Sequence, residues 1–330
     1  MDNKLKDFSR WIRNNSLSTK IPSDIDKLKN LSVLDLTKSK IRELPDSICS
    51  LTNLTVLKLS GNRLTELPFD IGKLKKLRNL QCENNLLGEL PKSIGDLESL
   101  VILNLNGNRL KTLPDEFFNL IRLTRLTIAA NSLETISDKL SNLKNLLYFS
   151  LDTNCLKELP EVFQYMKSLY YLDLSYNNFS KLPQSISKIQ ELETLLLEGN
   201  EITDLPSLES HDMLIKLNLN DNKLSKIDFD ISKLEDLQLL SLDNNNLEYL
   251  PDAICELEKL NYLSISANQL KELPECIGKL ENLLELDIDE NKISKFPESF
   301  FKLKKLKNLY IEENEGLQRP DLESLEFCDI

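Results

Sequence analysis

Asparagine recurs along this chain at an almost constant spacing, and that spacing constrains the fold more than any other feature. Neighbouring members of the series are 23 residues apart, except for one step of 22 residues. The members are Asn62, Asn85, Asn108, Asn131, Asn154, Asn177, Asn200, Asn222, Asn245, Asn268, Asn291 and Asn314. A repeat of this length is typical of a solenoid, in which each repeat packs only against its neighbours.

Each asparagine stands at one place in the pattern L-x-x-L-x-L-x-x-N-x-L-x-x-L-P-x-x-I-x-x-L-x-x. The leucines spaced two apart have the period of a half-buried strand. The asparagine amide can bond backbone groups left unpaired at the following turn, so we expect a ladder of such bonds. Proline donates no hydrogen bond and suits an arm outside the sheet, and I-x-x-L suits a short helical or 3-10 turn. We therefore predict thirteen parallel strands on one face and short turns on the other.

The pattern resembles the leucine-rich-repeat family, and its second half is similar to the Ras-group-like intracellular type that is also common in bacteria. The resemblance covers roughly residues 21–314. It implies an α/β leucine-rich-repeat solenoid, or horseshoe, with a parallel sheet on the concave face and helical or 3-10 turns on the convex face. It implies no particular partner, because function lies in sites built onto a fold.

We predict three segments along the chain. Residues 1–20 form an N-terminal helical cap, since Leu5, Phe8 and Ile12 recur at helical spacing and a solenoid end needs a lid. A helix that lies on a membrane or binds a partner is the alternative. Residues 21–314 hold a half repeat, twelve full repeats and a truncated repeat, and residues 315–330 form a C-terminal cap or tail.

The charge of the chain limits its partners. The net charge is −12 and the isoelectric point is about 4.9, whereas nucleic acid and anionic membranes require a basic surface. We therefore expect neither as a partner. A protein with a basic surface is compatible with this charge, and the alternative is that the charge only keeps a long surface soluble.

The cysteines and the N-terminus bear on the compartment. The six cysteines are scattered and form no C-x-x-C pair, and Cys82 stands at a strand leucine position where we expect it to be buried. Extracellular members of the family usually close their ends with paired cysteines, which are not visible here. Residues 1–20 contain no long apolar run of a secretory signal. We expect a reducing, cytoplasmic location, with export into a host cell without a cleaved signal peptide as the alternative.

We expect no enzymatic activity, cofactor or metal site. The only histidine, His211, falls in the repeat at 192–213 that is one residue short, at a position that elsewhere carries leucine. That repeat is either a hinge or a bent site, or a neutral deletion absorbed by a loop. An open platform also offers no enclosed pocket that would shift the pKa of paired carboxylates.

The outward strand positions are informative because the core does not determine their residues. Tyrosine and aspartate cluster near the middle of the chain, and acidic residues thicken toward the C-terminal end. Tyrosine supplies a large contact area with a polar tip and often anchors interfaces. The predicted partner-binding residues are Tyr148, Asp152, Tyr171, Asp173, Tyr176, Glu198, Asp243, Tyr262, Asp287 and Asp289.

The leading hypothesis is a monomeric scaffold that recognises another protein on its concave face. In related proteins such repeats act as scaffolds in signalling, and in bacterial effectors they select host targets. One alternative is a targeting subunit or fragment of a bacterial effector associated with a ubiquitin ligase. Another is a structural protein that self-associates.

Overall fold

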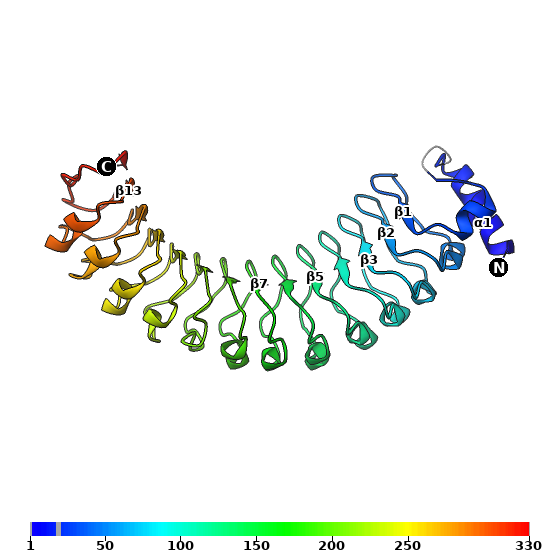
Figure 1. The fold of residues 1–330 in the computed structure, drawn as a ribbon, viewed down its shortest axis with the longest axis horizontal. Helices are drawn as coiled ribbons and strands as arrows, with labels where there is room; N and C mark the ends of the chain where they lie inside the picture. The colour runs from blue at the N-terminus through cyan, green and yellow to red at the C-terminus, as the bar shows by residue number, and fades with distance from the viewer. Residues whose placement is uncertain (1, 18–20, 330) are drawn as a thin grey trace. The chain divides into compact units, whose positions relative to one another are not determined.

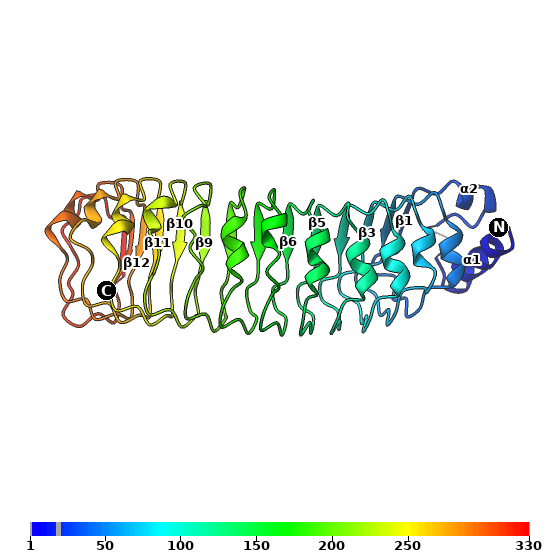
Figure 2. The ribbon, with the colours of Figure 1, turned by 90° about the horizontal axis from the view of Figure 1, so that it is seen from below.

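The computed structural model describes residues 2–17 and 21–329, and the chain divides into two compact units, Met1–Leu156 and Lys157–Ile330. In each unit the strands follow one side and the 3-10 helices follow the other (Figures 1 and 2). The predicted fold class, a solenoid with a parallel sheet on one face and short turns on the other, is confirmed. Met1, residues 18–20 of the predicted cap and Ile330 lie outside the described residues.

The first unit begins with two α-helices, α1 (Asp2–Asn14) and α2 (Ile25–Lys29). Its strands are β1 (Val33–Asp35), β2 (Val56–Lys58), β3 (Asn79–Gln81), β4 (Ile102–Asn104), β5 (Arg125–Thr127) and β6 (Tyr148–Ser150). Its 3-10 helices are η1 (Asp46–Ser50), η2 (Ile71–Lys73), η3 (Lys92–Asp96), η4 (Asp115–Asn119) and η5 (Asp138–Asn142). Each strand pairs in parallel with the next, in register 23 residues apart.

The second unit continues the same alternation. Its strands are β7 (Tyr171–Asp173), β8 (Thr194–Leu196), β9 (Lys216–Asn218), β10 (Leu239–Ser241), β11 (Tyr262–Ser264), β12 (Glu285–Asp287), β13 (Asn308–Tyr310) and β14 (Phe327–Asp329). Its 3-10 helices are η6 (Phe163–Tyr165), η7 (Gln184–Lys188), η8 (Ile231–Lys233), η9 (Asp252–Glu256), η10 (Ile277–Lys279) and η11 (Glu298–Lys302). Thr194 pairs with Lys216, so the 22-residue step is absorbed without a change of strand register.

The asparagines form the predicted ladder. Asn108, which is 9% exposed, donates from Nδ2 to the carbonyl oxygens of Cys82 in the preceding repeat (3.1 Å) and of Leu105 in its own repeat (2.9 Å). Its Oδ1 accepts from the backbone N–H of Leu87 at 3.0 Å. The second unit repeats the arrangement, for example at Asn245. One buried side chain thus satisfies backbone groups of two repeats, which would be costly to leave unpaired.

The residue before each ladder asparagine has a positive φ, a feature that the sequence analysis missed. Glycine occupies this position at Gly61, Gly107 and Gly199, but larger residues adopt it elsewhere, including Tyr176 at φ 52°. Left-handed backbone costs a non-glycine residue about 1 kcal/mol or more. The ladder therefore holds a turn that most of these side chains would not adopt by themselves.

Helix α1 covers the first repeat. Leu5, Phe8 and Ile12 are fully buried, and the helix lies against η1 and α2. The side chains that a membrane-lying helix would expose are therefore in the core. None of the helices in the described part of the chain is long and apolar enough to cross a membrane.

The C-terminal tail forms a strand that the sequence analysis did not predict. Asn308 pairs with Phe327, and Tyr310 pairs with Asp329, so β14 extends the sheet beyond β13. The rings of Tyr310 and Phe327 lie 5.4 Å apart. No repeat motif marks this strand, because its side chains pack against one neighbour only.

The interpretation of the cysteines as scattered, unpaired residues is wrong for one pair. Cys255 and Cys276 form a disulfide, with their Cα atoms 5.8 Å apart. Their separation of 21 residues is close to one repeat, so successive arms bring them together. Cys82 is buried as predicted, whereas Cys155 is exposed.

His211 is buried at the leucine-like position of the short repeat, with 1% of its surface exposed. Its ring nitrogens lie 3.1 Å from the Leu208 carbonyl oxygen and 3.2 Å from that of Ile186. Burial lowers its pKa, and the two carbonyls offset part of this effect. The described chain has no 3-10 helix between β8 and β9, so the missing residue is taken from the turn.

Replacing His211 with leucine is expected to weaken the loss of stability in mild acid. Unfolded histidine titrates near pH 6.5, and the folded pKa is lower, so the unfolded state binds more protons as the pH falls through 6.5. The folded state is therefore destabilised there, and leucine removes this contribution. Urea unfolding at pH 7.5 and pH 5 measures it, and an equal loss in both proteins would refute the assignment.

Candidate partner-binding surface

The candidate surface is the sheet face, which we define as the outward side chains of the strands and the residue two positions after each strand. In β7 the middle residue Leu172 is fully buried, while Tyr171 and Asp173 on either side are half-buried. The same alternation holds at Leu286 in β12. Successive side chains of a strand point to opposite faces, so the core leucines direct their neighbours onto the sheet face.

Two predicted residues, Tyr148 and Asp152, lie in the first unit. The Arg125 guanidinium stacks over the Tyr148 ring, 3.6 Å from its centroid. Asp152 accepts a hydrogen bond from the Ser150 hydroxyl at 2.5 Å. The cation over the ring covers part of the tyrosine surface that the sequence analysis expected to be free.

Four predicted residues lie at the start of the second unit. The Tyr171 hydroxyl donates to Asp173 at 3.4 Å, and the Tyr176 hydroxyl donates to Glu198. Asn218 also donates to Glu198, at 2.8 Å. The carboxylate bond is the main cause that raises the pKa of Tyr176 to about 12, so this phenol stays protonated. Tyr176 remains 51% exposed although its hydroxyl is held.

Gly199 makes room for Tyr176. A Cβ at Gly199 would lie 2.5 Å from the Tyr176 ring, and Gly199 itself has φ +66°. Any larger residue would have to move the ring or strain its own backbone. Gly199 is therefore a functional candidate that the sequence analysis missed, although a glycine one repeat after an exposed tyrosine was visible.

The remaining predicted residues, Asp243, Tyr262, Asp287 and Asp289, form an acidic group at the C-terminal end of the sheet face. Asp243 accepts from the Ser264 hydroxyl at 2.5 Å and from the Ser266 N–H at 2.8 Å. Asp287 accepts from the Asp289 N–H at 3.1 Å.

Burial and mutual repulsion change the protonation of this group. The pKa of Asp289 is raised to about 6, first by burial and then by the charges of Asp287, Glu312 and Asp329, against a bond from the Glu312 N–H. The pKa of Asp287 is raised by burial and by Asp243 and Glu285. Burial is also the main cause that raises the pKa of Tyr262. Asp329 was missed because its strand carries no repeat motif.

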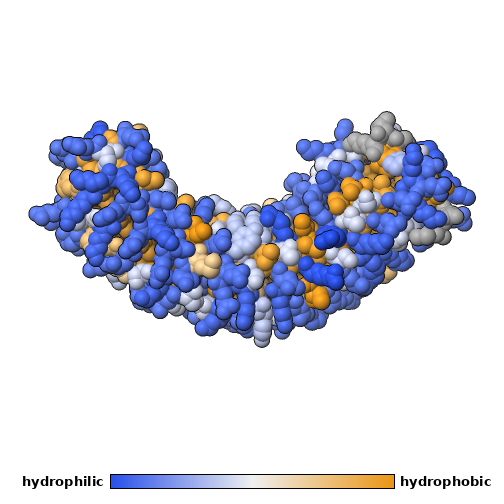
Figure 3. Space-filling model, in the orientation of Figure 1, coloured by the Kyte–Doolittle hydropathy of each residue, from blue (hydrophilic) through white to orange (hydrophobic). Residues whose placement is uncertain are grey.

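The acidic group has no internal counter-charge. Among the described residues, no lysine or arginine forms an ion pair with Asp243, Glu285, Asp287, Asp289 or Glu312. The ion pairs of this unit lie off the sheet face, as in Lys259–Asp236 and Lys279–Glu256. Figure 3 shows hydrophilic residues over most of the visible surface, with hydrophobic residues scattered among them.

The described residues contain no group of three or more histidine, cysteine, aspartate or glutamate side chains that could hold a metal ion. The carboxylates of the acidic group instead accept hydrogen bonds from hydroxyl and backbone N–H groups. The sheet face therefore offers charge and hydrogen-bonding groups for recognition.

Comparisons with known proteins identify the family. A model described as a leucine-rich repeat region matches residues 10–85, 69–169 and 253–328, and a model described as a leucine rich repeat matches residues 159–202 and 213–270. The chain belongs to the leucine-rich-repeat family. A search of curated proteins finds no match to this chain.

Solved structures agree with this assignment. A leucine-rich-repeat protein of Leptospira interrogans is 30% identical, with a TM-score of 0.76, over 93% of this chain and 92% of that one. The plant peptide hormone receptor RGFR1, solved in complex with RGF2, is 28% identical with a TM-score of 0.76, over 88% of this chain and 50% of that one. The functional domain of InlJ from Listeria monocytogenes shares the fold, with a TM-score of 0.80 and 22% identity, over 99% and 70% of the two chains.

Proposed function

We propose that this chain is a protein-binding module that holds a basic segment of a partner on the sheet face of residues 157–330. The observation that carries the proposal is the set of five carboxylates without a counter-ion, Asp243, Glu285, Asp287, Asp289 and Glu312. Gathering like charges raises the free energy of the unbound protein, and a cationic partner relieves it.

Aromatic side chains supply the contact area beside these charges. Tyr176 keeps a left-handed backbone, has its hydroxyl bonded to Glu198 and exposes half of its surface. Strained residues that persist in a structure are often functional. A ring that is already fixed loses little freedom on binding, which makes it a suitable anchor.

The relatives support a protein or peptide partner in general terms. The receptors RGFR1 and PEPR1 were solved with the peptides RGF2 and AtPEP1. The chain spans half of each of these two receptors, so their activities do not transfer. We propose that the module acts as a monomeric scaffold in signalling and is not an enzyme.

The compartment is a separate proposal. The sequence favours the cytoplasm, with export into a host cell without a cleaved signal peptide as the alternative. The Cys255–Cys276 disulfide favours the second location, because disulfides persist mainly in oxidising compartments. An effector associated with a ubiquitin ligase would fit export as well, and a self-associating protein would not need the acidic group.

Neutralising the acidic group is expected to abolish capture of the partner. The test variant is Asp243→Asn/Asp287→Asn/Asp289→Asn, in which asparagine keeps an oxygen that can accept the observed hydrogen bonds. We expect about tenfold or greater loss of affinity, since each buried charge pair that is lost weakens binding by more than 1 kcal/mol. Affinity capture followed by titration with the purified partner measures this loss.

The matched control removes three exposed carboxylates from the arms of the same unit, as Glu158→Gln/Glu248→Gln/Glu272→Gln. It changes the net charge equally and should leave capture unchanged. Equal weakening by both variants would mean that net charge alone attracts the partner. Undiminished capture by the test variant would remove the acidic group from the binding site.

A further inference from the structure

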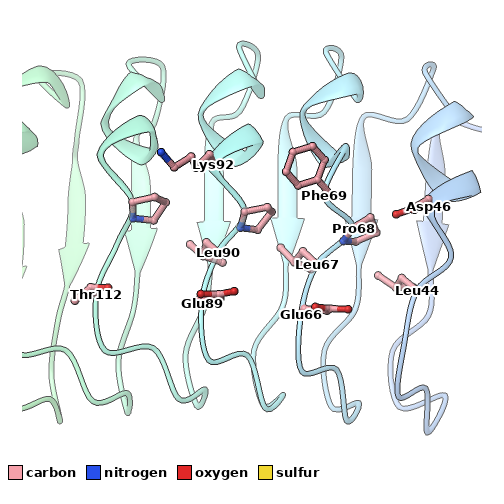
Figure 4. Close-up of a pocket in the computed structure, with 12 residues that line it drawn as sticks. Leu44, Asp46, Glu66, Leu67, Pro68, Phe69, Glu89, Leu90, Lys92 and Thr112 are labelled. Atoms are coloured by element: carbon pink, nitrogen blue, oxygen red, sulfur yellow. The ribbon is translucent and has the colours of Figure 1, made fainter.

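A groove of about 610 Å³ lies on the connecting arms of the first unit, away from the sheet face. Figure 4 shows its lining side chains on three successive arms, between the end of each asparagine turn and the 3-10 helix that follows. Leu67, Leu90 and Pro68 supply an apolar floor, and Glu66 and Glu89 stand at the same place on neighbouring arms. A volume of this size accommodates several side chains of a ligand.

Phe69 is the unusual residue of this groove. It is 76% exposed and follows the motif proline, at a position where the neighbouring repeats carry Asp46 and Lys92. Its carbonyl oxygen accepts a hydrogen bond from the Ser93 hydroxyl, so the backbone below the ring is tied to the next arm. An exposed phenylalanine on a fixed backbone beside an apolar floor offers a preformed contact for another side chain.

The charges around the groove are uncompensated and negative. Among the described residues, Asp46, Glu66 and Glu89 form no ion pair with lysine or arginine. Lys92, the one cation among the residues that line the groove, is 3.4 Å from Glu116 and is therefore already paired. Carboxylates beside an apolar contact complement a ligand that combines positive charge with an apolar group.

We propose that this groove binds a basic peptide segment of a partner protein in which arginine flanks an aromatic or large apolar side chain. The apolar side chain packs on Phe69 and Pro68, and the flanking cations face Glu66 and Glu89. The negative rim disfavours an anionic membrane or nucleic acid at the same place. This second surface does not depend on the sheet face, and either can fail without the other.

A dye-labelled peptide Gly-Arg-Trp-Arg-Gly tests the proposal by fluorescence anisotropy with the full chain. We expect saturable binding that weakens about tenfold in Phe69→Ala and in Glu66→Gln/Glu89→Gln, as for anchor residues of an interface. Phe69 is exposed, so its replacement should not disturb folding. Tyr249→Ala, which removes an exposed aromatic from an arm of the other unit, is the matched control and should bind like the wild type.

Several results would overturn the proposal. One is peptide binding that survives both groove variants but is lost in Asp287→Asn/Asp289→Asn, which would place the peptide on the sheet face. Equal binding of Gly-Glu-Trp-Glu-Gly would remove the role of the carboxylates. A dimer in sedimentation that disappears in Phe69→Ala would assign the groove to a second copy of the chain.

Discussion

Replacing Asn108 with alanine is expected to lower the free energy of unfolding by about 3 kcal/mol or more, since each buried polar group left unpaired costs roughly 1–3 kcal/mol. The side chain satisfies the carbonyl oxygens of Cys82 and Leu105 and the N–H of Leu87. Alanine leaves all three without this partner and opens a small cavity between two repeats. The effect should therefore exceed that of an ordinary surface substitution.

Urea unfolding followed by circular dichroism measures this change, with Asn79→Ala as the control. Asn79 is a half-buried asparagine of the same unit whose Oδ1 has no hydrogen-bond partner. Its replacement should change stability by less than about 1 kcal/mol. Equal midpoints for Asn108→Ala and Asn79→Ala would show that the ladder contributes little to stability.

Replacing Gly95 with alanine is the second large change, with an expected cost of about 2–3 kcal/mol from overpacking. An added Cβ would lie 1.9 Å from the backbone carbonyl oxygen of Glu116 on the next arm. Backbone cannot rotate away as a flexible side chain can, so η3 and η4 would have to separate. The same close approach occurs in the second unit, between Gly278 and Ser299.

Gly88→Ala is the matched control for Gly95→Ala. A Cβ at Gly88 meets no atom within 4 Å, so alanine there should be neutral or stabilise by roughly 0.4–1 kcal/mol through the unfolded state. Thermal unfolding of the two variants in parallel gives the comparison. If both shifted the midpoint equally, the packing of neighbouring 3-10 helices would not explain why glycine is present at residue 95.

Much of the fold could be predicted because the repeat states the same constraint many times. The position of Asn108 in the motif predicts a buried amide after a strand, and the structure contains it. The left-handed residue before it was not predictable from residue type, since Ala130, Tyr176 and Glu290 share that backbone. Backbone hydrogen bonding imposes this conformation, and the side chain only tolerates it.

Features that depend on two neighbouring repeats were harder to predict. Cys255 and Cys276 are 21 residues apart, and only their alignment against the 23-residue period indicates that they meet. Asp329 raises the pKa of Asp289 from a strand without a repeat motif. The outward placement of the predicted site residues followed from strand alternation, whereas their use by a partner remains a prediction.

The most direct test of partner binding on the sheet face is amide hydrogen exchange of the full chain with and without the captured partner. Our account predicts slower exchange in the partner complex at residues 171–176, 196–200 and 241–290, on the strands and the turns that follow them. Exchange in η7–η10 should not change. Protection confined to those 3-10 helices, or no protection anywhere in residues 157–329, would contradict the proposed binding surface.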